Sequence, residues 1–123
     1  MTHTPANQSL GRLGEQLALE HYERLGFVLI ARNHRTRTGE IDLIVRDART
    51  IVFVEVKARR AGGLDPFVGL TVSKRRRMRA LAAEWLWEHP DRPHAEALRI
   101  DAVAVVLDER DRMIALEQVE DVA

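Results

Sequence analysis

The chain has 123 residues, of which 19 are Lys or Arg and 19 are Asp or Glu, so its formal net charge is zero. That total combines three unlike segments. Residues 1–31 carry 2 basic and 3 acidic side chains, residues 32–79 carry 13 and 5, and residues 80–123 carry 4 and 11. A basic middle segment is typical of a surface that faces a polyanion. The lack of cysteine excludes disulfides, thiolate metal sites and cysteine nucleophiles.

Hydropathy along the chain argues against a membrane protein. The longest purely apolar stretch, Ala102 to Leu107, is far shorter than the ~20 residues that a membrane helix needs. The first ten residues have neither the basic start nor the apolar run of a secretion signal. We therefore expect a cytoplasmic protein with a flexible leader over residues 1–9 and a single domain over residues 10–123.

The first predicted element is a helix from about Leu10 to Leu25, with Asn7 or Ser9 as its N-cap and Gly26 at its end. Gly14 lies in the middle of the apolar face of this helix. Glycine there lowers helix propensity, so its presence predicts a close approach to a neighbouring element. Glu15, next in the chain, lies at the edge of that face and is expected to be half-buried.

Strands and a second helix follow. A short apolar run over residues 27–30 predicts a strand, residues 32–39 a basic loop, residues 40–46 a second strand, residues 47–50 a turn and residues 51–58 a third strand. A helix over Val72–Glu88, capped by Thr71 or Ser73, precedes strands over residues 98–107 and 113–119. The order predicts a mixed α/β fold in which three strands lie between two helices.

Three charged residues interrupt the apolar strands. Side chains alternate along a strand, so Glu55 and Lys57 share one face of the third strand, and a short hairpin can bring Asp42 beside Glu55. We expect Glu40 to point to the opposite sheet face from Asp42. Two carboxylates form the oxygen-rich environment that Mg²⁺ or Mn²⁺ prefers, and the nearby lysine suits phosphodiester hydrolysis. A buried carboxylate–lysine pair without a metal explains the same spacing.

Longer strings carry a resemblance to a known family. They are residues 11–15 (GRLGE), 33–35 (NHR), 39–44 (GEIDLI), 52–59 (VFVEVKAR) and 99–101 (RID). In this order they resemble the YraN family of small bacterial proteins, and the pair of strings around Asp42 and Glu55 resembles the PD-(D/E)xK nuclease signature, with Ile41 in the place of proline.

The resemblance implies a restriction-endonuclease-like αβββαβ core, similar in layout to archaeal Holliday-junction resolvases. It implies that Glu15, Asp42 and Glu55 hold Mg²⁺ or Mn²⁺ and that Lys57 is the catalytic lysine. By analogy with those resolvases, a homodimer is expected. Asp101, by contrast, is expected to be structural and to pair with Arg99 or with the basic second helix.

Basic residues flank the acidic group on both sides in the sequence. The nucleic-acid-binding candidates are Arg35, Arg37, Arg59, Lys74, Arg75 and Arg77, with Arg32, Arg60, Arg76 and Arg79 as further members. Several of them occupy the start of the second helix, where cations oppose the helix dipole and an anionic partner explains their placement. The low aromatic content favours recognition of the phosphate backbone over base stacking. A solvated arginine-rich face is the alternative.

Three functions are compatible with these patterns. The leading hypothesis is a Mg²⁺- or Mn²⁺-dependent endonuclease that hydrolyses duplex or branched DNA. The second is a non-catalytic nucleic-acid-binding or protein-interaction module that keeps the nuclease fold. The third is a purely structural protein, which predicts no retention of DNA even at low salt.

Overall fold

We analysed a computed structural model of the chain, which describes residues 6–63 and 71–123. The elements follow one another as α1 (Ala6–Arg24), β1 (Val28–Arg35), β2 (Glu40–Arg46), β3 (Thr50–Arg60), α2 (Val72–Glu88), β4 (Ala97–Leu107) and β5 (Met113–Val119). Within the described residues, no helix is both long and apolar enough to cross a membrane.

The five strands form one mixed sheet in the order β1-β2-β3-β4-β5. The first three strands pair antiparallel, β3 and β4 pair in parallel, and β5 returns antiparallel to β4. A parallel pair needs a long crossover connection, and the segment that contains α2 supplies it between β3 and β4. The predicted mixed fold is confirmed, and the αβββαβ order matches a restriction-endonuclease-like core to which β5 adds an edge strand.

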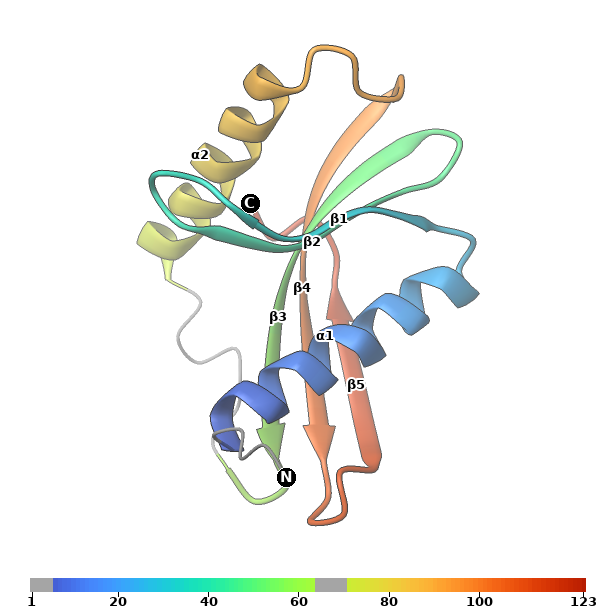
Figure 1. Cartoon of the computed structure of the whole chain (residues 1–123), viewed down its shortest axis with the longest axis vertical. Coiled ribbons are helices and arrows are strands. Elements are labelled where there is room, and N and C mark those ends of the chain that lie inside the picture. Colours follow the sequence, from blue (N-terminus) through green and yellow to red (C-terminus); the bar gives the residue numbers. More distant parts are fainter. Residues whose placement is uncertain (1–5, 64–70) are drawn as a thin grey trace, which may run out of the picture.

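The two helices cover opposite faces of the sheet (Figure 1). Alternation along β3 explains this arrangement, because Val52 and Val54 pack with Ala18 and Tyr22 of α1, whereas Phe53 packs on the side of α2. On that second side the apolar face predicted for α2 is confirmed, since Leu81, Ala82 and Trp85 are buried and Met78 packs against them.

Helix α1 approaches the sheet closely through Gly14. A Cβ atom on this residue would lie 2.5 Å from the Cβ of Ala58 in β3, closer than real Cβ atoms pack. Glycine is therefore required at this crossing, as the sequence predicted. The close approach also brings the next residue, Glu15, toward the point where β2 and β3 separate.

Two local predictions need correction. Helix α1 already includes Ala6, so the proposed caps Asn7 and Ser9 lie inside it, while residues 1–5 of the predicted leader lie outside the described residues. Strand β1 extends to Arg35 through residues predicted to be loop, because its backbone pairs with β2 as far as Glu40.

Helix ends elsewhere agree with the sequence. The backbone turns at Gly26 with φ 94°, which ends the first helix where glycine predicted it. At the start of α2, the Thr71 hydroxyl accepts from the backbone N–H of Lys74 at 3.2 Å. Thr71 is therefore the N-cap, and Ser73 lies inside the helix.

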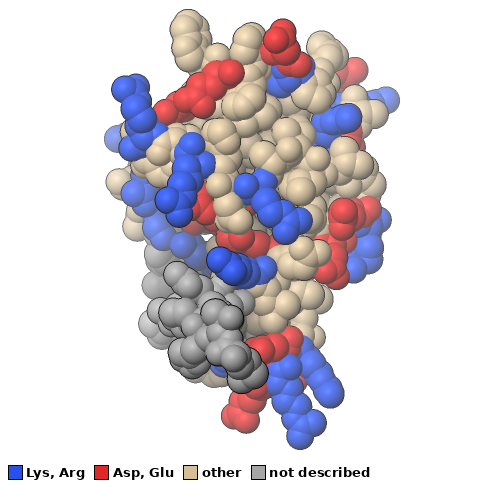
Figure 2. All heavy atoms as spheres, in the orientation of Figure 1, with Lys and Arg blue, Asp and Glu red and all other residues tan. Residues whose placement is uncertain are grey.

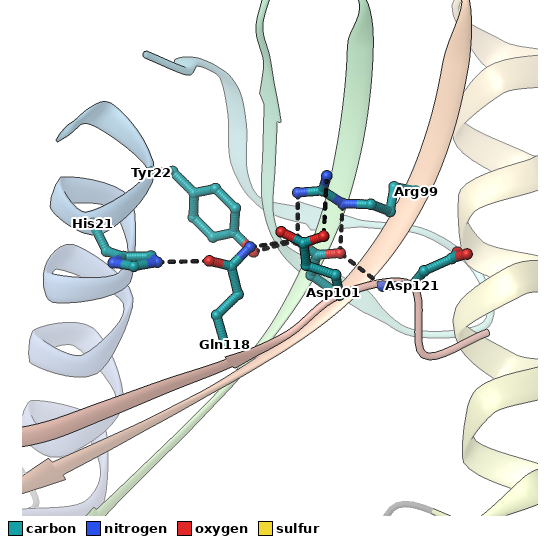
Figure 3. A network of polar contacts seen from close by, with 7 residues as sticks. His21, Tyr22, Arg99, Asp101, Gln118 and Asp121 are labelled. Atoms are coloured by element: carbon teal, nitrogen blue, oxygen red, sulfur yellow. Dashed lines mark hydrogen bonds and ion pairs between the residues drawn. The ribbon is translucent and has the colours of Figure 1, made fainter. Parts of the chain in front are cut away.

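A buried carboxylate joins α1 to β4, β5 and the C-terminal segment (Figure 3). Asp101 of β4 is fully buried and accepts hydrogen bonds from Tyr22 at 2.7 Å, Gln118 at 3.0 Å and the backbone N–H of Asp121 at 3.1 Å. Arg99 donates to both of its carboxylate oxygens, at 2.9 and 3.0 Å. A buried carboxylate is stable only when donors satisfy its oxygens, and here they come from α1, β4, β5 and the segment after β5. Asp101 therefore has the structural role expected for it, with Arg99 as its charged partner.

Candidate metal and phosphate site

The site lies where β2 leaves β3. Regular pairing between the two strands ends at Leu43 and Val54. Beyond that point the β1–β2 hairpin turns toward α2 while β3 runs on (Figure 1). Because the strands diverge, backbone groups on this edge of β3 have no hydrogen-bond partner in β2. The Asp42 carboxylate replaces the missing strand for one of them and accepts a hydrogen bond from the backbone N–H of Val56 at 2.7 Å. Asp42 is thereby fixed at the fork between the strands.

The hairpin is held in this position from the side of α2. Thr38, at its tip, donates a hydrogen bond through Oγ1 to the Glu84 carboxylate of α2 at 3.1 Å. Within the turn, the backbone N–H of Thr36 donates to the carbonyl of Gly39 at 2.7 Å. These two contacts hold in place the β1–β2 hairpin, whose second strand carries Glu40 and Asp42.

Three carboxylates meet at the fork. Glu15 of α1 and Glu40 and Asp42 of β2 each place a carboxylate oxygen so that the three oxygens lie within 4.8 Å of one another. This is the only group of this kind within the described residues whose spacing suits a metal ion. The structure therefore joins Glu15 to Asp42, although the two residues are far apart in the sequence.

The position of Glu40 contradicts the sequence prediction, which placed it on the opposite sheet face from Asp42. Residues two apart in a strand share a face, so the two side chains project to the same side. The two-residue periodicity of a strand would thus have predicted that Glu40 lies beside Asp42. The Glu40 carboxylate also lies 3.8 Å from the Arg35 guanidinium, an exposed ion pair.

Glu55 and Lys57 lie on β3 beside this group. Leu43 pairs with Val54, and continuing this register by one residue puts Asp42 opposite Glu55. The Lys57 ammonium lies 3.1 Å from the Glu55 carboxylate, and 24% of the Glu55 side chain is exposed. Glu55 is therefore paired with Lys57 rather than grouped with the three carboxylates, although it is close enough to influence the charge of Asp42.

Burial and crowding of like charges change the proton affinity of these groups. Burial raises the pKa of Asp42 to about 7; the hydrogen bond from Val56 opposes this shift and the charge of Glu55 adds to it. Burial also raises the pKa of Glu15, against a hydrogen bond from the Asn33 side chain that lowers it. Both carboxylates would gain from a neighbouring cation.

The pKa of Lys57 is raised as well, but for an ammonium this shift favours the charged form. Burial lowers the pKa of its ammonium, but the nearby Glu55 and Asp42 carboxylates outweigh burial and raise it overall. Lys57 is accordingly a cation at neutral pH. It can donate hydrogen bonds or offset negative charge, while removal of a proton from water does not suit its charged form.

Basic side chains of α2 differ in how near they lie to the acidic group. Lys74 lies next to Lys57, whereas Arg75, which is partly exposed, lines a pocket with Asp121 of the C-terminal segment, and Arg77 is exposed. On the hairpin, Arg35 and Arg37 are exposed. Figure 2 shows Lys and Arg side chains on several sides of a small acidic group near the middle of one face.

Two other basic candidates are engaged within the chain. Arg59 donates to the carbonyl oxygens of Arg60 and Gly63 at 3.3 and 3.2 Å. Arg60 forms an ion pair of 2.7 Å with Asp111 and donates to the carbonyl of Asp108. These contacts support the end of β3, so α2 and the hairpin remain as the freer basic surfaces.

Comparison with known proteins gives the family of the chain. Residues 14–105 match the family described as uncharacterised protein family UPF0102. The chain belongs to this family, also called the YraN family. The matched span runs from the helix that carries Glu15 into β4, so it includes every residue of the candidate metal group.

Curated relatives agree over most of the chain. A UPF0102 protein of Mycolicibacterium vanbaalenii is 45% identical over 113 residues, which cover 89% of this chain and 90% of the relative. UPF0102 proteins of Acidothermus cellulolyticus and Nocardia farcinica are 42% and 46% identical, covering 82% and 81% of this chain and 83% and 78% of the relatives. These names state no activity.

Proposed function

We propose that this UPF0102 chain is a Mg²⁺- or Mn²⁺-dependent endonuclease that hydrolyses phosphodiester bonds in duplex or branched DNA. The observation that carries the proposal is the convergence of Glu15, Glu40 and Asp42 at metal-ligand spacing beside the Glu55–Lys57 pair. Charges in such a place are costly unless they have a partner, and a divalent cation is the partner that this set of oxygens fits.

The donor set supports a hard cation. Carboxylate oxygens are the ligands that Mg²⁺ and Mn²⁺ prefer, and the group has no sulfur or imidazole ligand. Glu15, Glu40 and Asp42 would hold the ion, and Glu55, paired with Lys57, would add negative charge from β3. When bound, such an ion polarises the phosphoryl oxygen and lowers the pKa of a coordinated water.

The chain's own residues supply the remaining functions. Asp42 is fixed by Val56 and faces the other carboxylates. Lys57, held by Glu55 as an ammonium, can orient a water and offset the charge that grows on phosphorus during attack. Arg35, Lys74 and Arg77 would hold flanking phosphates, which would fix the scissile bond without reading its sequence.

Cleavage of defined DNA substrates tests this proposal. Labelled single-stranded, duplex, flapped and four-way DNA are incubated with the purified full chain in Mn²⁺, in Mg²⁺ or in EDTA. We expect cuts in duplex or four-way DNA with either metal and none in EDTA. Salt-sensitive binding without cuts in any divalent ion would instead favour the non-catalytic binding module.

A further inference from the structure

Asn33 has a backbone conformation that is unusual for a strand. Among the described residues other than glycine, three have positive φ, and only Asn33, with φ 51°, lies inside a strand. Left-handed backbone is uncommon for side-chain-bearing residues, asparagine being one of the few that tolerate it. Such conformations concentrate at functional sites, where they aim a particular group.

The register of β1 places this residue at the acidic group. Arg32 pairs with Leu43 and His34 pairs with Ile41, so Asn33 stands opposite Asp42. Glu15 of α1 places a carboxylate oxygen within 4.8 Å of one on Asp42, so Asn33 stands beside both carboxylates, and its side chain lowers the pKa of Glu15. One neutral amide thus lies where β1, the fork between β2 and β3, and the first helix meet.

A neutral donor is the appropriate group at this point. Glu15 belongs to a helix and must approach two other carboxylates, Glu40 and Asp42, which repel it when no cation is present. A hydrogen bond from an amide holds the carboxylate without neutralising it, so its full charge stays available to a cation. The neighbouring Arg32 donates its hydrogen bond to Gln16 at 3.3 Å and acts on Glu15 only through its charge, which lowers the pKa of that carboxyl.

We propose that Asn33 is a positioning residue that holds the Glu15 carboxylate in place for divalent-metal binding. The inference rests on the proposed function and deepens it, because it assigns the arrangement of the metal ligands to a residue that is not itself a ligand. Residues that orient metal ligands in this way typically contribute about 10- to 100-fold to metal affinity.

Mn²⁺ binding to four forms of the full chain tests this inference. Asn33→Gly removes the amide but keeps the backbone, since glycine adopts positive φ freely. It is compared with the wild type, with Glu15→Ala and with the double variant, using Mn²⁺ electron paramagnetic resonance for affinity and circular dichroism melts for folding.

We expect Asn33→Gly to weaken Mn²⁺ binding about tenfold and to cause no further loss in the Glu15→Ala background. Unchanged affinity in Asn33→Gly, or an equal loss in both backgrounds, overturns the inference and leaves the proposed function standing. Absence of Mn²⁺ binding by the wild type overturns both. If Asn33→Gly lowers the melting temperature, Asn33→Ser replaces it, because serine keeps a small polar side chain that is too short to span the same gap. Its Mn²⁺ affinity is compared in the same two backgrounds, with the same outcomes supporting or overturning the inference.

Discussion

At the scale of single residues, Asp42 has two roles. Its carboxylate completes the hydrogen bonding of β3 through Val56, and it faces the charges of Glu15 and Glu40. Ionised Asp42 is costly in the metal-free protein, as its pKa of about 7 indicates. Under the proposed function, this loss of stability accompanies the capacity to bind a cation, a common trade-off at functional sites.

The first prediction concerns Asp42→Asn, which keeps the acceptor for Val56 and removes the charge. The folded pKa of Asp42 is raised above its unfolded value of 3.8, so ionisation favours the unfolded state and stability falls as pH rises from about 4 through 7. In EDTA the variant should be more stable than the wild type by about 1–3 kcal/mol at pH 8. The gain should shrink toward pH 4. Urea unfolding across this pH range measures it.

Asp47→Asn is the matched control for this prediction. Asp47 accepts hydrogen bonds from the backbone N–H groups of Arg49 and Thr50, and these bonds lower its pKa. Its ionised form supports the folded state at pH 8, and that support is lost as pH falls through the folded pKa. Asp47→Asn should therefore give no stabilisation at pH 8. Equal stabilisation by both variants would contradict the account of Asp42.

Residue identities at the site were only partly accessible from sequence. Spacing along the strands was enough to bring Asp42 near Glu55, and the family strings pointed to Glu15. Glu40 was misplaced, although strand periodicity was sufficient to find it. Asn33 was not singled out, because its role depends on a single left-handed residue inside a strand, and asparagine in a basic segment gives no such signal.

At the scale of elements, the crossing of α1 over β3 sets the geometry of the site. Gly14 allows the helix to contact Ala58, and Glu15 follows directly in the chain. The sequence predicted this contact because glycine weakens a helix and is favoured in an apolar helix face only where a neighbouring element packs closely against it. Strand β1 was predicted too short, since its second half carries basic and polar side chains that are typical of loops, whereas its pairing uses only backbone groups.

The second prediction compares two glycines of the same helix. Gly14→Ala should destabilise the protein by about 1–2 kcal/mol, because overpacking against Ala58 exceeds the gain in helix propensity. Gly11→Ala should stabilise it by up to about 1 kcal/mol, since nothing lies within 4 Å of the added Cβ. Urea unfolding measures both. Gly14→Ala should also weaken Mn²⁺ binding by displacing Glu15, and stabilisation by both variants would refute the close crossing.

At the scale of the whole molecule, neutrality is a sum of separated charges. The strongly acidic segment 80–123 balances the basic segment 32–79. Within that basic segment, Glu40 pairs with Arg35 of the hairpin and Glu55 pairs with Lys57, beside which Lys74 of α2 lies. A metal-dependent phosphodiesterase needs this pattern, in which carboxylates hold a cation and surrounding cations hold the DNA backbone.

The third prediction tests this surface through its salt dependence. Alanine variants at Lys74, Arg75 and Arg77 should each weaken DNA binding, and the slope of log affinity against log salt should fall by about 0.9 for each duplex phosphate that is no longer neutralised. Arg110→Ala and Arg112→Ala, in the turn between β4 and β5, should leave affinity and slope unchanged. Fluorescence anisotropy between about 50 and 200 mM salt measures both. Equal effects at the two places would contradict a localised interface.

Cleavage of four-way and duplex DNA in Mn²⁺ by the wild type and by Asp42→Ala, Glu55→Ala and Lys57→Ala tests the central claim most directly. Binding is measured in parallel on the same DNA. The account predicts that the wild type cuts and that each variant binds the DNA but no longer cuts it. Cutting that persists in all three variants, or a wild type that binds Mn²⁺ and DNA without cutting either substrate, would contradict it.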